Sequence, residues 1–139
     1  MRVAHVEQDR FDITIRQHTL GVDQPRADGG SDTAPTPTEL FVASLASCVA
    51  FYVRRFLDRH GLSTEGLAVD ASYSMASGPA RVDRIGIVLQ LPEGIPEDRI
   101  PALMAVATHC TVHNSLVEAP EVQFDLEVGE RPLDSAVGM

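Results

Sequence analysis

Residues 36–61, TPTELFVASLASCVAFYVRRFLDRHG, form the stretch around which the rest of the chain is organised. Thr36 can serve as a helix N-cap, Pro37 suits the first helical position, and Glu39 completes a capping box with Thr36. Gly61 offers the left-handed residue that commonly closes a helix. These signals predict one long helix between them.

The interior of this helix is apolar. Residues 40–53 carry no charge, so we expect neighbours to bury the helix on several sides. A run of this length spans roughly 21 Å as a helix, short of the roughly 30 Å hydrocarbon core of a bilayer. The stretch therefore predicts a buried core helix and not a membrane span.

Cys48 lies in the middle of this helix. At 100° per residue it borders a sector that is largely small or polar, formed by Ser44, Ser47, Phe51, Arg54 and Arg55. Taken alone, a cysteine in such a place is explained by core packing at least as well as by reactivity.

The composition indicates which binding partners and which cellular compartment to expect. The chain has 139 residues, enough for one domain with its own core. Its net charge of −9, from 11 basic and 20 acidic residues, argues against nucleic acid or an anionic membrane as a partner. Residues 1–10 lack an apolar leader, so we expect a cytoplasmic protein, in which two cysteines seldom form a structural disulfide.

The segments on either side of the helix alternate between apolar and polar residues, as strands do. Before it, short strands around 3–5, 11–15 and 20–22 predict an antiparallel meander, followed by a Gly- and Pro-rich loop. After it, residues 67–75 and 85–91 predict a long hairpin with one apolar face.

The C-terminal third shows a second helical pattern. Apolar residues from Ile100 onward keep helical spacing, and we expect this helix to reach Cys110. A short helix over 111–118 follows after a bend, and 122–128 alternates as a closing strand. We expect 129–139 to be a loosely ordered tail.

Together these elements predict an α+β fold, a single domain over 1–139 with antiparallel sheets and two main helices. A helix that is apolar on all sides is difficult to cover within one domain of this size. We therefore expect a homodimer in which the central helices of two copies pack together.

The two cysteines are the residues most suited to chemistry. Peroxide reduction by thiols needs a reactive cysteine, a cation nearby and a second thiol that resolves the sulfenic acid. Metal binding is the competing use, because His109, Cys110 and His113 are close in sequence and Cys48 could join them. HC-x-x-H is not a recognised zinc spacing, so we expect no metal. No GxSxG, GxGxxG or P-loop motif is present.

The motifs PTPTELFVASLASC, HCTVHNSL and DQPRADGG resemble those of the OsmC/Ohr family of thiol-dependent hydroperoxide reductases, over nearly the whole chain. This resemblance implies an intertwined homodimer with the cysteine helix buried at its interface and two active sites there. It makes Cys48 the peroxidatic thiol and Cys110 the resolving thiol. It further implies organic hydroperoxides as substrates, a dithiol reductant, a role in oxidative stress, and neither metal nor organic cofactor.

One departure from the family pattern concerns an acidic residue. Reductases of this family carry it directly after the helix-starting proline, where this chain has Thr38, and Glu39 follows instead. On the helical wheel position 38 lies about 80° from Cys48, whereas Glu39 lies about 180° away. The capping box explains Glu39 better than catalysis does, although we keep it as a candidate site residue.

A second departure concerns the catalytic arginine that the resemblance implies in the N-terminal strands or the loop after them. None of Arg10, Arg16 and Arg26 sits in an identifying motif, and we favour Arg10, just before the second strand. Two functions stay open: a two-cysteine hydroperoxide reductase, and a non-catalytic OsmC-fold protein that binds an apolar small ligand at the dimer interface.

Overall fold

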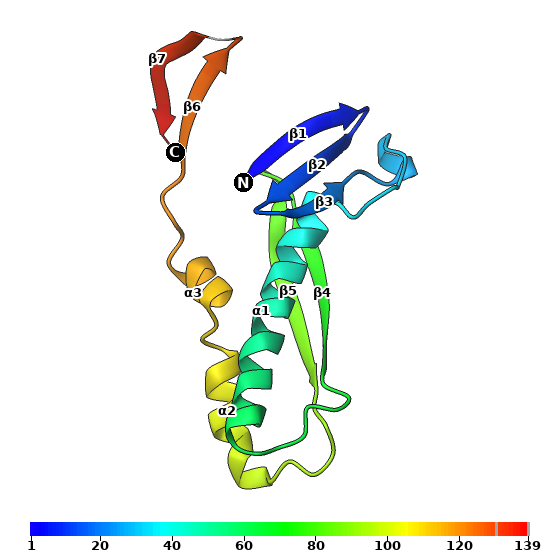
Figure 1. Cartoon of the computed structure of the whole chain (residues 1–139), viewed down its shortest axis with the longest axis vertical. Helices are drawn as coiled ribbons and strands as arrows, with labels where there is room; N and C mark the ends of the chain where they lie inside the picture. Colours follow the sequence, from blue (N-terminus) through cyan, green and yellow to red (C-terminus); the bar gives the residue numbers. More distant parts are fainter. Residues whose placement is uncertain (130, 139) are drawn as a thin grey trace.

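The computed structural model describes residues 1–129 and 131–138 of the chain. Within these residues it has three antiparallel sheets and three α-helices, which confirms the predicted α+β class. Helix α1 (Pro37–Arg59) runs along the hairpin of β4 (Ala68–Ala76) and β5 (Arg81–Gln90), and the N-terminal sheet lies at the start of the helix (Figure 1).

The N-terminal sheet is the predicted meander. Strands β1 (Arg2–Glu7), β2 (Arg10–Ile15) and β3 (His18–Val22) pair antiparallel in that order. Ile13 of the central strand lies opposite Val3 on one side and Leu20 on the other. The apolar residues of the three alternating segments therefore lie opposite one another in this sheet, as the sequence pattern predicts.

The loop that follows carries a short 3-10 turn, η1 (Arg26–Asp28), and is otherwise irregular. It is fixed at both ends by Asp23, which is only 2% exposed. The Asp23 carboxylate accepts the backbone N–H of Gln24 at 2.7 Å and both the N–H and the hydroxyl of Thr33, at 3.0 and 2.7 Å. One buried carboxylate thus holds Gln24 and Thr33 together at the two ends of this ten-residue loop.

Both ends of α1 follow their sequence signals. The Thr36 hydroxyl accepts the Glu39 N–H at 3.0 Å, and the Glu39 carboxylate accepts the Thr36 N–H at 2.9 Å, which completes the capping box. At the other end Gly61 has φ +66, and the Leu62 N–H donates to the Leu57 carbonyl at 2.9 Å. This is a Schellman closure, which the left-handed glycine makes possible.

The face of α1 that meets the hairpin forms the core. The register places Val69, Ala71 and Tyr73 of β4 opposite Leu89, Ile87 and Ile85 of β5. Opposed residues in an antiparallel pair share a face, so the predicted apolar face of the hairpin is confirmed. The buried residues of the helix are Val42, Leu45, Val49, Val53, Phe56 and Leu57.

The opposite face of α1 is open in a single chain, so the burial that we expect on several sides stays a prediction that depends on the second copy of the homodimer. Phe41 and Phe51 are 43% and 48% exposed, because hairpin and helices cover only one side of α1 in a single chain. By length and composition α1 also qualifies as a membrane span, which is weak evidence, since the core helix of a soluble protein passes the same test.

The second helical region differs from its prediction. Helix α2 (Ile100–Ala107) follows the short turn η2 (Glu97–Arg99) and ends before Cys110, which is instead the N-cap of α3 (Thr111–Val117). The ending has a local cause: the Thr108 hydroxyl and His109 Nδ1 lie 2.8 and 2.7 Å from the carbonyls of Met104 and Ala105. These side chains bond to the last carbonyls of the helix in place of a further helical turn.

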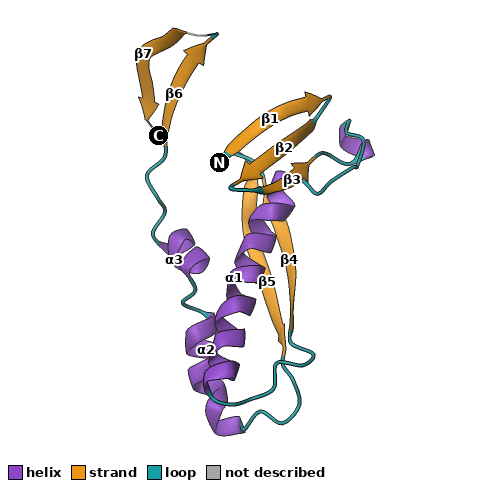
Figure 2. Cartoon of the chain, in the orientation of Figure 1, coloured by secondary structure: helices purple, strands orange, loops and turns teal. Residues whose placement is uncertain are grey.

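The C-terminus also differs from its prediction. The expected closing strand is confirmed as β6 (Gln123–Val128), but residues expected to form a loose tail are paired with it as β7 (Arg131–Gly138). Backbone hydrogen bonds of the ladder order this segment, and they need no apolar alternation. The hairpin stands apart from the other sheets (Figure 2), and the β6 residues Phe124, Leu126 and Val128 are exposed.

Candidate active site around Cys48 and Cys110

Cys48 lies where the buried and the open faces of α1 meet. It is partly exposed and packs against the buried cluster that includes Leu45 and Val49, its neighbours on the core side of the helix. A thiol at this edge is reachable from outside while its helix holds it rigidly. The helical wheel predicts this position correctly.

Cys110 has no solvent exposure and belongs to the same cluster, with Leu103 and Ala107 of α2. Its Sγ accepts the backbone N–H of His113 at 3.4 Å and so caps α3. Both cysteines are free thiols. The early end of α2 therefore places the second thiol at a helix start facing α1, and not within a helix as the sequence suggested.

The two thiols are close enough to influence each other. Burial raises the pKa of Cys110, and the His113 N–H partly opposes it. The neighbouring Cys48 thiol raises the Cys110 pKa further. The structure thus brings together the two cysteines that the sequence singled out, one accessible and one buried.

Arg10 does not reach this pair within one chain. Its guanidinium donates to the Thr33 carbonyl at 3.2 Å and to the Thr33 hydroxyl at 3.0 Å, and it forms an ion pair with Asp12 at 3.4 Å. Among the described residues, none of its hydrogen bonds or ion pairs involves a cysteine. Since Asp23 holds Thr33, the loop clasp also fixes Arg10.

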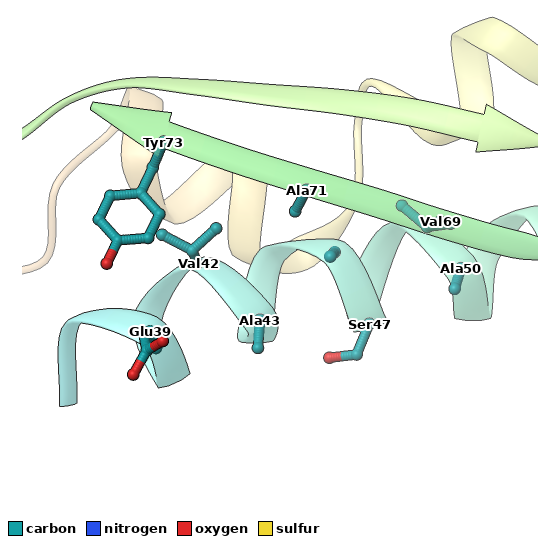
Figure 3. A pocket seen from close by; sticks show the side chains of 9 residues that line it. Glu39, Val42, Ala43, Ser47, Ala50, Val69, Ala71 and Tyr73 are labelled. Carbon is teal, nitrogen blue, oxygen red and sulfur yellow. The ribbon is translucent and has the colours of Figure 1, made fainter. Parts of the chain in front are cut away.

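Glu39 lies away from the thiols as well. It lines an open groove of about 460 Å³ between α1 and β4, beside Ala43, Ser47 and Tyr73 (Figure 3). Neither cysteine lines this groove. Its carboxylate is engaged in the capping box, as the helical wheel suggested.

An apolar cavity of about 280 Å³ is lined by residues adjacent to the thiols, although neither cysteine lines it itself. Leu45 and Val49, which flank Cys48 on the core side, form one wall, and His113, whose N–H caps Cys110, forms part of another. A second hollow of about 310 Å³ shares Leu45 and His113 with it and includes Arg84. The remaining lining residues of the first cavity are Ile85, Ile87, Leu89, Met104, Ala107 and Thr108.

The sequence analysis names His113 only as part of a metal cluster that it does not favour, and it does not single out Tyr52. The Tyr52 hydroxyl lies 2.8 Å from the Thr111 hydroxyl, which joins α1 to the residue after Cys110. The spacing from Cys110 to His113, that of an N-cap to its N3 residue, was the available signal for the histidine. Over the described residues, no group of three or more His, Cys, Asp or Glu side chains is arranged to hold a metal ion.

The chain is thus an α+β protein that holds a partly exposed thiol near a buried one. Comparison with known proteins gives its family. The family model of OsmC-like proteins matches residues 29–125. This match covers more than half of the chain, so the chain belongs to the OsmC-like family. No curated protein matches the sequence.

Solved structures share this fold. An osmotic stress and detoxification response protein from Psychrobacter arcticus has a TM-score of 0.76 at 22% identity, covering 82% of this chain and 85% of its own. An OsmC-like protein from Mycoplasma pneumoniae has a TM-score of 0.72 at 15% identity, with 85% and 86% covered. An organic hydroperoxide resistance protein from Legionella pneumophila has a TM-score of 0.58 at 23% identity, with 84% and 89% covered. At these identities the similarity shows the fold alone.

Proposed function

We propose that this chain is a thiol-dependent peroxidase that reduces organic hydroperoxides through a two-cysteine cycle. The observation that carries the proposal is the pairing of a partly exposed Cys48 with a fully buried Cys110 beside an apolar cavity. Membership of a family that includes a protein named for organic hydroperoxide resistance supports the same reaction.

Each catalytic cycle consumes one hydroperoxide and one dithiol. The Cys48 thiolate attacks the distal peroxide oxygen, the O–O bond breaks, and the alkoxide leaves as an alcohol after taking a proton. The sulfur of Cys110, after losing its proton, then attacks Sγ of the Cys48 sulfenic acid. The S–O bond breaks, water leaves and a disulfide forms, which a dithiol reductant returns to two thiols by exchange.

We further propose that the active unit is a homodimer. The open face of α1 exposes Phe41 and Phe51, and β6 exposes Phe124, Leu126 and Val128, which is the kind of surface that a second copy covers. A thiolate beside an apolar core needs a cation, and the bonds of Arg10 to Thr33 and Asp12 leave it without a contact to the thiols of its own chain. In this proposal Arg10 of the partner subunit is the candidate cation, and no metal or organic cofactor takes part.

The second candidate function is binding of an apolar small ligand without catalysis. The cavity of about 280 Å³ beside the thiols favours it, since an apolar pocket with few polar groups suits such a ligand. In this case Cys48 is a core residue that packs behind the cavity wall formed by Leu45 and Val49. We place either activity in the cytoplasm, where thiols stay reduced.

Consumption of an alkyl hydroperoxide by the reduced protein, with a dithiol present, separates the two functions. The peroxidase proposal predicts turnover that Cys48→Ser abolishes, because the nucleophile is gone. Ser47→Ala, one residue earlier on the open face, is the matched control and should turn over normally. Absence of turnover by the unmodified, fully reduced protein would leave the binding function in its place.

A further inference from the structure

Helix α3 depends on tertiary contacts for its position. It has seven residues, too few to be stable alone, and it is joined to the rest of the chain by the irregular residues 108–110 and 118–122. Its exposed side carries Leu116 and Val117, which are 40% and 75% exposed. Whatever fixes α3 against α1 therefore also fixes Cys110 against Cys48.

The contacts between α1 and α3 are few and of two kinds. Val112 packs against the buried cluster that contains Cys110. The Tyr52 and Thr111 hydroxyls lie 2.8 Å apart, and in the part of the chain that the structure describes this is the one side-chain hydrogen bond that joins the two helices. Apolar packing is non-directional, whereas a hydrogen bond fixes a distance and an angle.

This hydrogen bond and the thiol pair lie side by side between the same two helices. Tyr52 comes one turn after Cys48 and lies about 40° from it on the helical wheel. Thr111 directly follows Cys110. The bond therefore sets the position of α3 along α1 next to the two thiols.

We propose that Tyr52 and Thr111 are positioning residues that set the rate at which the Cys48–Cys110 disulfide closes. The inference rests on the proposed function for its biological meaning, since the sulfenic acid on Cys48 is formed by an organic hydroperoxide. In the closing step the Cys110 sulfur attacks Cys48 Sγ, and the leaving hydroxide takes a proton to give water. The hydroxyls of Tyr52 and Thr111 take no part in the bonds that form or break, and they act through the placement of Cys110.

The closing rate is measured by stopped-flow after one equivalent of alkyl hydroperoxide is added to the reduced protein. Tyr52→Phe and Thr111→Val should each slow closure about fivefold, the value of one typical hydrogen bond. The double variant should be no slower than either single variant, because both remove the same bond. Thr111→Ser keeps the hydroxyl and should restore the rate.

Two controls separate positioning from general damage. Tyr73→Phe removes the chain's other tyrosine hydroxyl, on β4, and should leave closure unchanged. In a Cys110→Ser background, Tyr52→Phe should not alter the rate of the first oxidation, because Cys48 does not move. Equal closure in Tyr52→Phe and the unmodified protein, or Thr111→Ser as slow as Thr111→Val, would overturn the inference.

A peroxide-free readout keeps this test independent of the proposed function. In mixtures of reduced and oxidised glutathione, the equilibrium for forming the intramolecular disulfide depends on how closely the thiols are held. Tyr52→Phe and Thr111→Val should each shift that equilibrium about fivefold toward the dithiol. An unchanged equilibrium contradicts positioning, whereas absence of hydroperoxide turnover alone contradicts only the peroxidase.

Discussion

Cys110 Sγ accepts the backbone N–H of His113 at 3.4 Å, so the buried thiol is also the cap of helix α3. Burial raises the Cys110 pKa, this N–H lowers it in part, and the neighbouring Cys48 raises it again. Cys110 is therefore protonated at neutral pH and closed to solvent. This arrangement suits a residue that acts second, after an accessible thiol has been oxidised.

The raised pKa of Cys110 predicts the pH dependence of disulfide closure. Because the attacking species is the thiolate, closure should accelerate with pH and continue to do so above pH 9.0, the ordinary value for the group. Stopped-flow closure rates between neutral and alkaline pH provide the check. A plateau reached well below pH 9.0 would show that Cys110 is already ionised there.

The lowered pKa of Asp23 predicts that the stability of the native state depends on pH in the acid range. Hydrogen bonds from the Thr33 backbone, the Thr33 hydroxyl and the Gln24 backbone lower its pKa from 3.8 to about 2. A lowered pKa stabilises the native state above 3.8, and this contribution is lost as the pH falls toward 2. Asp23→Asn should therefore unfold at lower urea than the unmodified protein at neutral pH, and the difference should narrow as the pH falls through this range. Asp28→Asn, in the same loop, is the control and should give no such difference.

The buried position of Leu103 predicts a large loss of stability when its side chain is shortened. It has no solvent exposure and lies in the same buried cluster as Cys110. Leu103→Ala should lower the free energy of unfolding by about 2–5 kcal/mol, because a cavity remains. Val117→Ala on the exposed side of α3 should change it by less than about 0.5 kcal/mol. Urea unfolding compares the two, and equal effects would contradict this description of the core.

Local signals in the sequence predicted much of the fold. The capping box of Thr36 and Glu39 and the left-handed Gly61 fixed the ends of α1, because each depends only on residues nearby. The position of Cys110 could not be predicted in this way. Apolar spacing continues past the end of α2, and only the back-bonding of Thr108 and His109, visible in three dimensions, ends the helix before the thiol.

In the candidate site, too, features set by nearby residues could be predicted, and contacts between distant residues could not. The helical wheel placed Cys48 at the edge of a face and Glu39 on the far side, and both placements hold. Tyr52 and Thr111 are 59 residues apart, and no local pattern links them. Strand β7 was missed because its pairing uses backbone groups, while Pro132 and the lack of alternation argue against a strand.

The exposed apolar face of β6 predicts a homodimer in solution. Size-exclusion chromatography with light scattering at micromolar concentration should give twice the mass of the chain. Leu126→Glu places a charge on that face and should shift the mass toward the monomer. Gln123→Glu, on the other face of the same strand, is the matched control. A mass of one chain for the unmodified protein would contradict the predicted homodimer.

The most direct measurement for the two-cysteine cycle is the oxidation of the Cys110→Ser variant by alkyl hydroperoxide. With the resolving thiol absent, the variant should consume one equivalent of hydroperoxide, hold a sulfenic acid on Cys48 that dimedone traps, and form no intramolecular disulfide. The unmodified protein should instead yield a Cys48–Cys110 disulfide, identified by mass spectrometry of its peptides. If Cys48 stays a thiol in both proteins while hydroperoxide remains, the cycle proposed here is contradicted.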